Sequence, residues 1–274
     1  MTQDYRPFKA LEHAGWSESG VSRTYETYFT SLTSQSIAPL LDAVGAVPGL
    51  RLLDVATGPG HLASLAAERG AAVTGVDVSP AMVEIARRLY PAVEFRAGDA
   101  EELPFPPASF DAVVMNYGLL HLSRPELAIA EAFRVLRSGG RFAFTVWAPP
   151  NVARGFGLIL ESVQAKGNPG VPLPAGPPFF RYANADESRA ALAAAGFNEV
   201  RVIDVPQRWL LPNPDALLEV FEEGTVRTRA LLKGQTPEVM QAIRAAVHAA
   251  AQAFATPGGL DIPMPAVLSS GVKP

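Results

Sequence analysis

Three aspartates recur at intervals of about twenty residues. Asp54 begins the segment Asp54-Val55-Ala56-Thr57-Gly58-Pro59-Gly60, Asp77 ends the next apolar run, and Gly98-Asp99-Ala100 follows the third. Glycines between a strand and a helix let a ligand approach the backbone, where the helix N-terminus presents free N–H groups. A carboxylate ending the next strand can accept hydrogen bonds from both hydroxyls of a ribose. These residues could therefore hold a cofactor that contains adenosine.

The first two features leave the kind of cofactor open. Gly58-x-Gly60-x-x-Ala63 also fits the dinucleotide-binding pattern, and Asp77 would serve NAD as well as S-adenosylmethionine. The third feature separates the two cofactors. An NAD(P)-dependent oxidoreductase explains neither Asp99 nor the loop at Leu103-Pro104-Phe105, so it remains the weaker interpretation.

The elements that would position these residues alternate between strand and helix from Leu50 onward. Short apolar runs of this kind are typical of parallel strands covered on both faces. We expect strands at Leu50–Ala56, Ala72–Val78, Val93–Ala97, Phe110–Asn116 and Arg141–Trp147, and helices at His61–Arg69, Pro80–Leu89 and Glu126–Leu136. The pattern predicts an α/β fold: a doubly wound, Rossmann-like, mostly parallel sheet with helices on both faces.

The segments before Leu50 and after Trp147 do not show this alternation of strand and helix. Residues 1–20 are expected to be irregular, with Gly15 and Gly20 as breaks, and a helix is expected over Arg23–Val44. Beyond Trp147 the periodicity predicts an inserted and C-terminal helical cap. Its expected elements are a Pro-rich loop at Gly167–Pro178, one strand at Val200–Leu211, a last strand at Pro265–Val272, and helices at Phe156–Ala165, Asp186–Ala195, Pro214–Glu223 and Pro237–Phe254.

The combined motifs resemble the class I S-adenosylmethionine-dependent methyltransferases. They are Asp54 with Gly58-x-Gly60, Asp77, Gly98-Asp99-Ala100, Phe110-Asp111 and Leu136-x-x-Gly139-Gly140. The chain is most similar to the small-molecule branch that includes the ubiquinone/menaquinone C-methyltransferases, with a methyltransferase domain of type 11. The resemblance covers roughly residues 16–147, with a weaker similarity over 189–205. It implies S-adenosylmethionine as cofactor, a methyl acceptor that is a small molecule, and a sheet of seven strands.

The resemblance also implies which residues hold the methionine end of the cofactor. Gly58 and Gly60 would let the backbone pack on the methionine and the ribose. Asp54 would fix this loop, which includes Thr57, and approach the methionine ammonium through water. The backbone at Asn116 would hold the same ammonium group.

At the adenosine end, the resemblance implies five further contacts. Asp77 would bind the ribose hydroxyls, and Val78 and Met82 would sandwich the adenine ring. Asp99 would accept a hydrogen bond from the adenine amino group, while the Ala100 N–H would donate to a ring nitrogen. Other interpretations exist for two of them, since Asp99 could cap a helix and Met82 could be core. At the methionine end, Asp54 could simply cap its turn.

Two residues of the glycine loop depart from the family pattern. Ala56 stands where many members have their first glycine, a change that costs little where the backbone dihedrals are ordinary but narrows the loop. Pro59 removes one N–H donor and stiffens the loop.

His121 is the candidate catalytic residue, because it follows Asn116 and so lies near the expected sulfonium. Histidine ionises near neutral pH and could take a proton from the acceptor as the methyl group moves. The alternative is a histidine that only lines the pocket. The acceptor pocket would be aromatic, although each of its candidates is a core residue by default; they are Tyr25, Tyr28, Tyr117, Trp147, Phe156, Phe179, Phe180 and Trp209.

Composition narrows the classes of function. The 274 residues carry a net charge of −4 and no Lys/Arg cluster, which disfavours nucleic acid as a partner. The chain has no cysteine, so disulfides and thiol chemistry are excluded. No His/Asp/Glu grouping has the spacing of metal ligands, so no metal is expected. The segment Asn116-Tyr117-Gly118-Leu119 lacks the Asn/Asp-Pro-Pro-aromatic signature for planar nitrogen acceptors, which favours a small metabolite.

Location and organisation follow from the same absences and patterns. The N-terminus has no signal-peptide pattern, and no apolar stretch of about 18 residues exists, so we expect a cytoplasmic protein without membrane contact. We expect lid helices over 1–45, the cofactor-binding core over 46–148, and a cap that also completes the sheet over 149–274, all in one structural domain. A homodimer and a catalytically silent cofactor-binding module both remain open.

Overall fold

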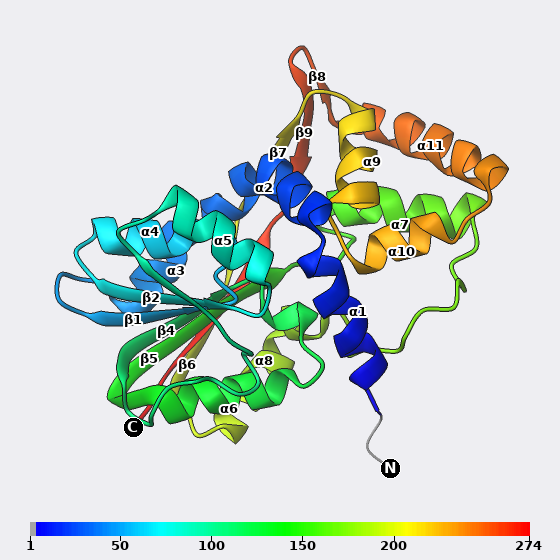
Figure 1. The fold of residues 1–274 in the computed structure, drawn as a ribbon. Helices are drawn as coiled ribbons and strands as arrows, with labels where there is room; N and C mark the ends of the chain where they lie inside the picture. The colour runs from blue at the N-terminus through cyan, green and yellow to red at the C-terminus, as the bar shows by residue number, and fades with distance from the viewer. Residues whose placement is uncertain (1–3) are drawn as a thin grey trace.

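A seven-stranded sheet forms the centre of the molecule (Figure 1). The computed structural model describes residues 4–274, and the strand order is β3-β2-β1-β4-β5-β10-β6. The strands are β1 (Arg51–Val55), β2 (Ala72–Asp77), β3 (Glu94–Ala97), β4 (Phe110–Asn116), β5 (Leu136–Trp147), β6 (Asn198–Val205) and β10 (Ala266–Val272). The first five are parallel, whereas β10 runs antiparallel to both β5 and β6. The expected mostly parallel sheet of seven strands is confirmed.

Helices cover both faces of this sheet, which explains why its inner strands are apolar. Leu52 and Leu53 in β1 and Val113 and Val114 in β4 are all fully buried. One face carries α3, α4 and α5 and the other carries α6 and α8 (Figure 1). Their bounds are α3 (Ile37–Val44), α4 (His61–Glu68), α5 (Pro80–Leu89), α6 (Pro125–Val135) and α8 (Ala185–Ala194).

The strand order reverses between β1 and β4. From β1 the chain moves outward to β2 and β3, and it then returns to place β4 and β5 on the other side. In open parallel sheets, ligands bind in the crevice outside the carboxyl ends of the two strands at such a point. The loops after β1, β2 and β4 carry the motifs singled out in the sequence, so they meet at this edge.

Two helices come before α3, and the first of them lies where the sequence predicted irregular chain up to residue 20. They are α1 (Arg6–Ser17) and α2 (Ser19–Thr33), and a short turn at Ser34–Ser36 separates them from α3. The prediction of a break at Gly15 was wrong for a steric reason. A Cβ atom there would lie 2.6 Å from Val226 Cγ2, so Gly15 permits a close helix contact instead of ending the helix.

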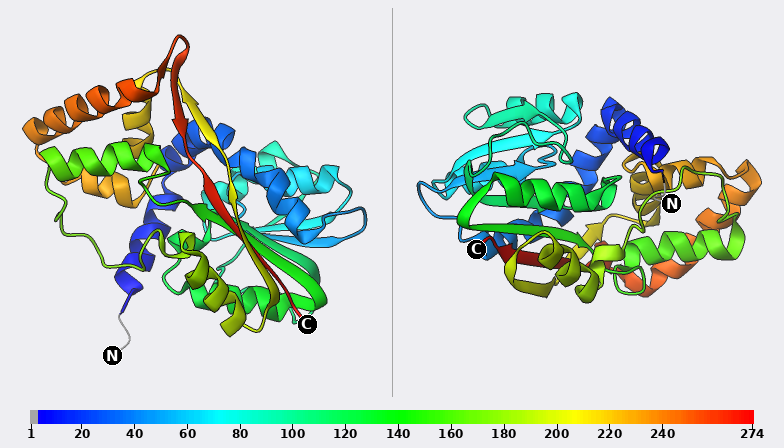
Figure 2. Two further views of the ribbon diagram at one scale, coloured as in Figure 1. Left: turned by 180° about the vertical axis from the view of Figure 1, so that it is seen from behind. Right: turned by 90° about the horizontal axis from the view of Figure 1, so that it is seen from below.

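A cap stands beside the carboxyl edge of the sheet, as Figure 2 shows from behind. Its helices pack on one another and on a small antiparallel sheet of order β7-β9-β8. The elements are α7 (Arg154–Lys166), α9 (Pro214–Glu223), α10 (Arg227–Lys233), α11 (Pro237–Ala251), β7 (Arg208–Leu211), β8 (Ala255–Thr256) and β9 (Gly259–Pro263). Residues 167–178 have no helix or strand, as expected.

Two further predictions about boundaries were wrong. Val200–Leu211 is not one strand: it divides at Pro206 and Gln207 into β6 of the main sheet and β7 of the cap. Proline has no N–H to contribute to a sheet, and the chain changes sheets there. The helix predicted to reach Leu136 ends at Val135, because Leu136 already pairs with Phe110 of β4.

Candidate active site

The loop between β1 and α4 is shaped by two glycines and one short hydrogen bond. Gly58 and Gly60 have positive φ angles of 53° and 87°, which glycine adopts without steric cost. At Gly60 a Cβ atom would lie 2.7 Å from the Phe95 ring, so a side chain there requires that ring to move. Thr57 Oγ1 donates to Asp54 Oδ2 over 2.6 Å and so ties the loop to the end of β1.

Ala56, in the same loop, has an unusual backbone conformation. Its φ of 54° lies in the left-handed region, so its dihedrals are not ordinary, and an alanine there is strained where a glycine would not be. The methyl group fills space beside the facing loop, since a Cβ atom on Gly118 would lie 2.6 Å from it. Both residues border the main cavity of this edge. The Ala56 methyl group therefore occupies space at the border of the cavity, and its left-handed backbone has a conformational cost.

Asp77 connects the glycine loop to the start of α5. Its Oδ2 accepts the Gly58 N–H over 2.9 Å and its Oδ1 accepts the Ser79 N–H over 2.8 Å. Burial raises the pKa of Asp77, although these two N–H groups act in the opposite direction. The carboxylate also borders the cavity, together with Val78 and Met82. A ribose hydroxyl bound here would share Asp77 with two backbone donors.

Asp54 should make cofactor affinity depend on pH. The side chain is buried, and burial raises its pKa to about 7 even though the Thr57 hydroxyl donates to it. A bound cation favours the ionised carboxylate and lowers this pKa, so binding releases a proton below pH 7. We expect affinity for S-adenosylmethionine, a sulfonium with an ammonium group, to rise about tenfold from pH 5.5 to 7.5 and then level off.

Isothermal titration calorimetry at both pH values, in buffers of different ionisation enthalpy, measures this affinity and the released proton. Asp54→Asn keeps an oxygen for the Thr57 hydroxyl but cannot ionise, so its affinity should be nearly equal at pH 5.5 and 7.5. An equal rise in the wild type and the variant would assign the pH dependence to another group.

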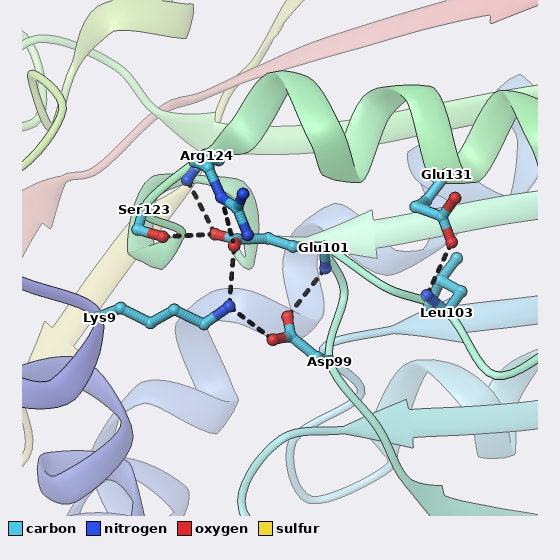
Figure 3. A network of polar contacts seen from close by, with 7 residues as sticks. All are labelled: Lys9, Asp99, Glu101, Leu103, Ser123, Arg124 and Glu131. Carbon is cyan, nitrogen blue, oxygen red and sulfur yellow. Dashed lines mark hydrogen bonds and ion pairs between the residues drawn. The ribbon is translucent and has the colours of Figure 1, made fainter. Parts of the chain in front are cut away.

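A cluster of charged side chains surrounds Asp99, at the predicted adenosine end of the site (Figure 3). Lys9 of α1 points its Nζ at Asp99 Oδ2 over 2.6 Å and at Glu101 Oε2 over 2.8 Å. Glu101 also accepts hydrogen bonds from Ser123 Oγ and from the Arg124 N–H, each over 2.8 Å. Asp99, the predicted acceptor for adenine, is therefore paired with Lys9 in this closed arrangement. Neither it nor Ala100 (6% exposed) borders the cavity.

Glu101 should contribute to stability in a way that acid removes. Burial alone would raise the pKa of Glu101, but the hydrogen bonds from Lys9 and Ser123 outweigh it and lower this pKa to about 2. Because the folded-state pKa lies below the value of 4.5 for a free glutamate, the contribution is present above pH 4.5 and is lost as pH falls toward 2.

Glu101→Gln should lower the free energy of unfolding by about 1–3 kcal/mol at pH 7, the range for a buried group left without its partners. Urea unfolding at pH 7, 4 and 3 should show the gap between wild type and variant closing with acid. Glu102→Gln, at the neighbouring exposed position, is the matched control and should change little. A gap of constant size would contradict the role of ionised Glu101.

Asn116 ends β4, and its side chain fastens the helices to the sheet. Its Oδ1 accepts from Ser36 Oγ over 2.9 Å and from Thr145 Oγ1 over 2.5 Å, while its Nδ2 donates to the Thr33 carbonyl over 3.2 Å. Both polar atoms of the amide side chain thus make structural hydrogen bonds, although the residue borders the cavity. The next residue, Tyr117, has a φ of 58° and turns the chain away from the strand.

His121 lies in the short turn after β4 and borders the main cavity. Its Nδ1 is 2.9 Å from Oε2 of Glu12, which belongs to α1. Trp16 Nε1 donates to the same oxygen over 3.0 Å, and its ring meets the imidazole edge to face, with centroids 5.0 Å apart. Glu12 is 1% exposed, and His13 beside it also borders the cavity. No sequence pattern indicated that Glu12 or Lys9 would lie here, since both come from a segment expected to be irregular.

A second, smaller cavity adjoins the first. Trp16, Tyr25, Tyr117 and His121 border both, so the two spaces meet at these side chains. The Tyr117 ring stacks on Trp147 with centroids 3.9 Å apart. The other aromatic residues of this cavity are Phe29, Trp147, Phe156 and Phe179.

Three predicted pocket residues lie elsewhere. Trp209 is fully buried in the core, where its Nε1 donates to the Tyr28 carbonyl over 3.1 Å. The Tyr28 hydroxyl points to Glu219 over 3.1 Å and borders neither cavity. Phe180 borders an outer groove beside residues 169–175. The two inner cavities therefore exclude these three residues, because packing directs them to the core, the surface and the groove.

The main cavity has a volume of about 100 Å³, below the roughly 300–1,000 Å³ of typical small-molecule sites. Its roof is formed by Glu12, His13, Trp16 and Tyr25 of α1 and α2. The cavity in this structure is therefore smaller than a typical bound ligand. Among residues 4–274, no group of three His, Asp or Glu side chains could hold a metal ion, and no helix is long and apolar enough to cross a membrane.

Comparison with known proteins identifies the central part of the chain. Residues 53–144 match the model of a methyltransferase domain. A demethylmenaquinone methyltransferase of Renibacterium salmoninarum is 42% identical over 111 residues, which are 40% of this chain and 47% of that protein. Another, from Beutenbergia cavernae, is 42% identical over 123 residues, covering 43% of this chain and 51% of its own. The chain thus spans about half the length of these curated relatives.

The fold also resembles a solved structure from Haemonchus contortus. It is a phosphoethanolamine N-methyltransferase in complex with phosphomonomethylethanolamine and S-adenosylhomocysteine, with a TM-score of 0.61 and 21% identity. The similarity covers 97% of this chain and 60% of that one, and at this identity it speaks for the fold. The resemblance drawn from the sequence motifs is confirmed. Residues 53–144 therefore match a methyltransferase domain.

Proposed function

We propose that this protein transfers the methyl group of S-adenosylmethionine to a small aromatic acceptor. One observation carries the proposal: a cavity bordered by Gly58 and Asp77, at the strand-order reversal between β1 and β4, meets an aromatic cavity at Tyr117 and His121. The residues that border the first space fit an adenosine cofactor, and the aromatic side chains that border the second, which has a volume of about 30 Å³ in this structure, offer flat surfaces for a planar acceptor. The names of the curated relatives, demethylmenaquinone methyltransferases, agree with this substrate class.

The residues present fit this cofactor. The glycine loop leaves room for close approach, since nothing lies within 4 Å of a Cβ atom built on Gly58. Asp77 offers acceptors for ribose hydroxyls, and Val78 and Met82 offer apolar surface for adenine. We assign the methionine end to Asp54, Thr57, Gly60 and the backbone at Asn116. Asp99 and Ala100 would contact adenine once Lys9 has withdrawn.

The protein's task in this reaction is alignment. The sulfonium supplies an already activated methyl group, so catalysis depends on holding the acceptor in line and keeping water out. Tyr117 and Trp147 form a stacked pair in the wall of the proposed acceptor cavity. The Phe156 ring packs on Trp147, and the Phe179 ring packs on Phe156. The Tyr117 hydroxyl donates to Gln207 Oε1 over 2.6 Å, which fixes the ring. We propose His121 as the group that receives a proton where the acceptor must lose one.

We propose the three parts that the sequence analysis predicted: lid helices over 1–45, the cofactor-binding core over 46–148, and over 149–274 a cap that also completes the sheet. Residues of α1 and α2 border the cavity, which supports the first range. Within residues 149–274, β6 and β10 belong to the main sheet and α8 packs on it. A small-molecule partner is sufficient for this function, and a homodimer is not required by it.

Calorimetric titration with S-adenosylhomocysteine and with NAD tests the cofactor assignment. We expect S-adenosylhomocysteine to bind and NAD not to bind, and the reverse result would make the protein an oxidoreductase. Release of S-adenosylhomocysteine from S-adenosylmethionine in the presence of aromatic acceptors then tests catalysis. Cofactor binding without product for any acceptor would favour a silent binding module.

A further inference from the structure

The pair formed by Glu12 and His121 has an arrangement that the cofactor site does not need. Glu12 is 1% exposed, yet one of its carboxylate oxygens, Oε1, has no hydrogen-bond partner. Its other oxygen holds both His121 Nδ1 and Trp16 Nε1. A buried carboxylate oxygen without a hydrogen-bond partner lowers the stability of the fold, so a functional reason for it is expected.

The hydrogen bond between these residues determines the state of the imidazole. A carboxylate oxygen can only accept, so the neutral His121 ring must carry its proton on Nδ1. Its Nε2 is then left as an unprotonated nitrogen, with no hydrogen bond to another residue among 4–274. The Trp16 ring stands against the imidazole and restricts its rotation.

The place of this ring in the molecule completes the argument. His121 borders both the cofactor cavity and the aromatic cavity, and its ring lies 6.0 Å from that of Phe179 in the latter. A base at the junction serves only an acceptor that loses a proton during transfer. The aromatic walls favour a planar ring, and a hydroxyl on such a ring is an acceptor that loses its proton on methylation.

We propose that Glu12 is a positioning residue that holds His121 as the base for an aromatic hydroxyl acceptor, a phenol or a hydroquinone. This inference rests on the proposed function and extends it. As the bond from the acceptor to the methyl group forms, the bond from sulfur to the methyl group breaks and its electron pair stays on sulfur. The acceptor gains one methyl group and loses one proton, which goes to His121 Nε2. The His121 side chain is 25% exposed, so the proton can pass on to water.

The tautomer can be tested without any acceptor. Long-range 1H–15N spectra of the S-adenosylhomocysteine complex, recorded where the ring is neutral and assigned with His121→Gln, should show His121 protonated on Nδ1. Glu12→Gln keeps an oxygen that can accept this N–H and should keep the tautomer, whereas Glu12→Leu should lose it. A wild-type His121 protonated on Nε2 would overturn the positioning role.

The second experiment measures turnover. It uses 1,4-dihydroxynaphthalene as acceptor and 1,4-dimethoxynaphthalene as the matched compound without acidic protons. We expect product only from the first. His121→Gln should lower kcat by 10²- to 10⁴-fold with the KM for S-adenosylmethionine nearly unchanged. Glu12→Leu should lower kcat at least tenfold, and Glu12→Gln should recover part of it.

His248→Gln is the control, because His248 also pairs with a carboxylate, Asp215 over 2.9 Å, but on the outer surface of the cap. Its turnover should equal that of the wild type. Unchanged turnover in His121→Gln would overturn the inference. So would a wild type that binds S-adenosylhomocysteine yet does not methylate 1,4-dihydroxynaphthalene, and the proposed function would then still stand. Failure to bind S-adenosylhomocysteine would instead reject the proposed function.

Discussion

Replacing Asp77 by alanine is expected to weaken S-adenosylhomocysteine binding by about 1.5–3 kcal/mol, which is roughly a 10- to 150-fold rise in Kd. The variant loses the acceptors for the ribose hydroxyls. It also leaves the N–H groups of Gly58 and Ser79 without the carboxylate that now holds them, so the glycine loop loses its link to α5. Isothermal titration calorimetry measures the change directly.

Two variants separate these contributions. Asp77→Asn keeps one oxygen that can accept a backbone N–H, so its loss of affinity should lie between those of the wild type and the alanine variant. Asp204→Ala removes an exposed carboxylate of β6 and should leave Kd unchanged. An affinity for Asp77→Ala within twofold of the wild type would reject the ribose role of this residue.

The largest expected effect on stability comes from Trp209→Ala in β7. The Trp209 side chain is fully buried, and its ring lies 4.9 Å from that of Phe29 and 6.1 Å from that of Phe221. Truncating a buried tryptophan removes these contacts and leaves a cavity, which costs about 3–5 kcal/mol. For a chain of this size the melting temperature should fall by roughly 6–20 °C in differential scanning calorimetry.

The neighbouring residue provides a matched control. Leu210 in the same strand is 70% exposed, so Leu210→Ala should change the melting temperature by no more than about 2 °C. Trp209→Phe keeps an aromatic ring but loses the hydrogen bond to the Tyr28 carbonyl, and it should fall between the two. Equal losses from Trp209→Ala and Leu210→Ala would show that Trp209 does not anchor α2 to the cap.

The central sheet could be predicted because its signals are local. Apolar runs mark β1, β2 and β4, and a capping residue before a proline marks α5, where Ser79 Oγ accepts the Met82 N–H over 3.2 Å. The N-terminal helix was missed because Gly15 looks like a helix breaker. Its purpose, close contact with Val226, depends on a residue more than two hundred positions away.

The same limit applies to the site. Gly58, Asp77, Val78 and Met82 carry a local pattern, and the structure brings them to one cavity. The partners that α1 supplies to Asp99 and His121 have no such pattern, since Lys9 and Glu12 reach across about 90 and 109 positions. Likewise, nothing in the spacing of the aromatic residues distinguishes Trp209 in the core from Trp147 at the cavity.

The antiparallel strand β10 has a consequence for the order of folding. It lies between β5 and β6 and pairs with both, although residues 266–272 are the last to leave the ribosome among the described strands. Until they arrive, β5 is an open sheet edge and β6 has no neighbour in the sheet. An exposed edge is a template for pairing with other chains, so synthesis passes through a stage prone to aggregation. The wide sequence separation of these pairs also predicts slow completion of the sheet compared with its parallel half.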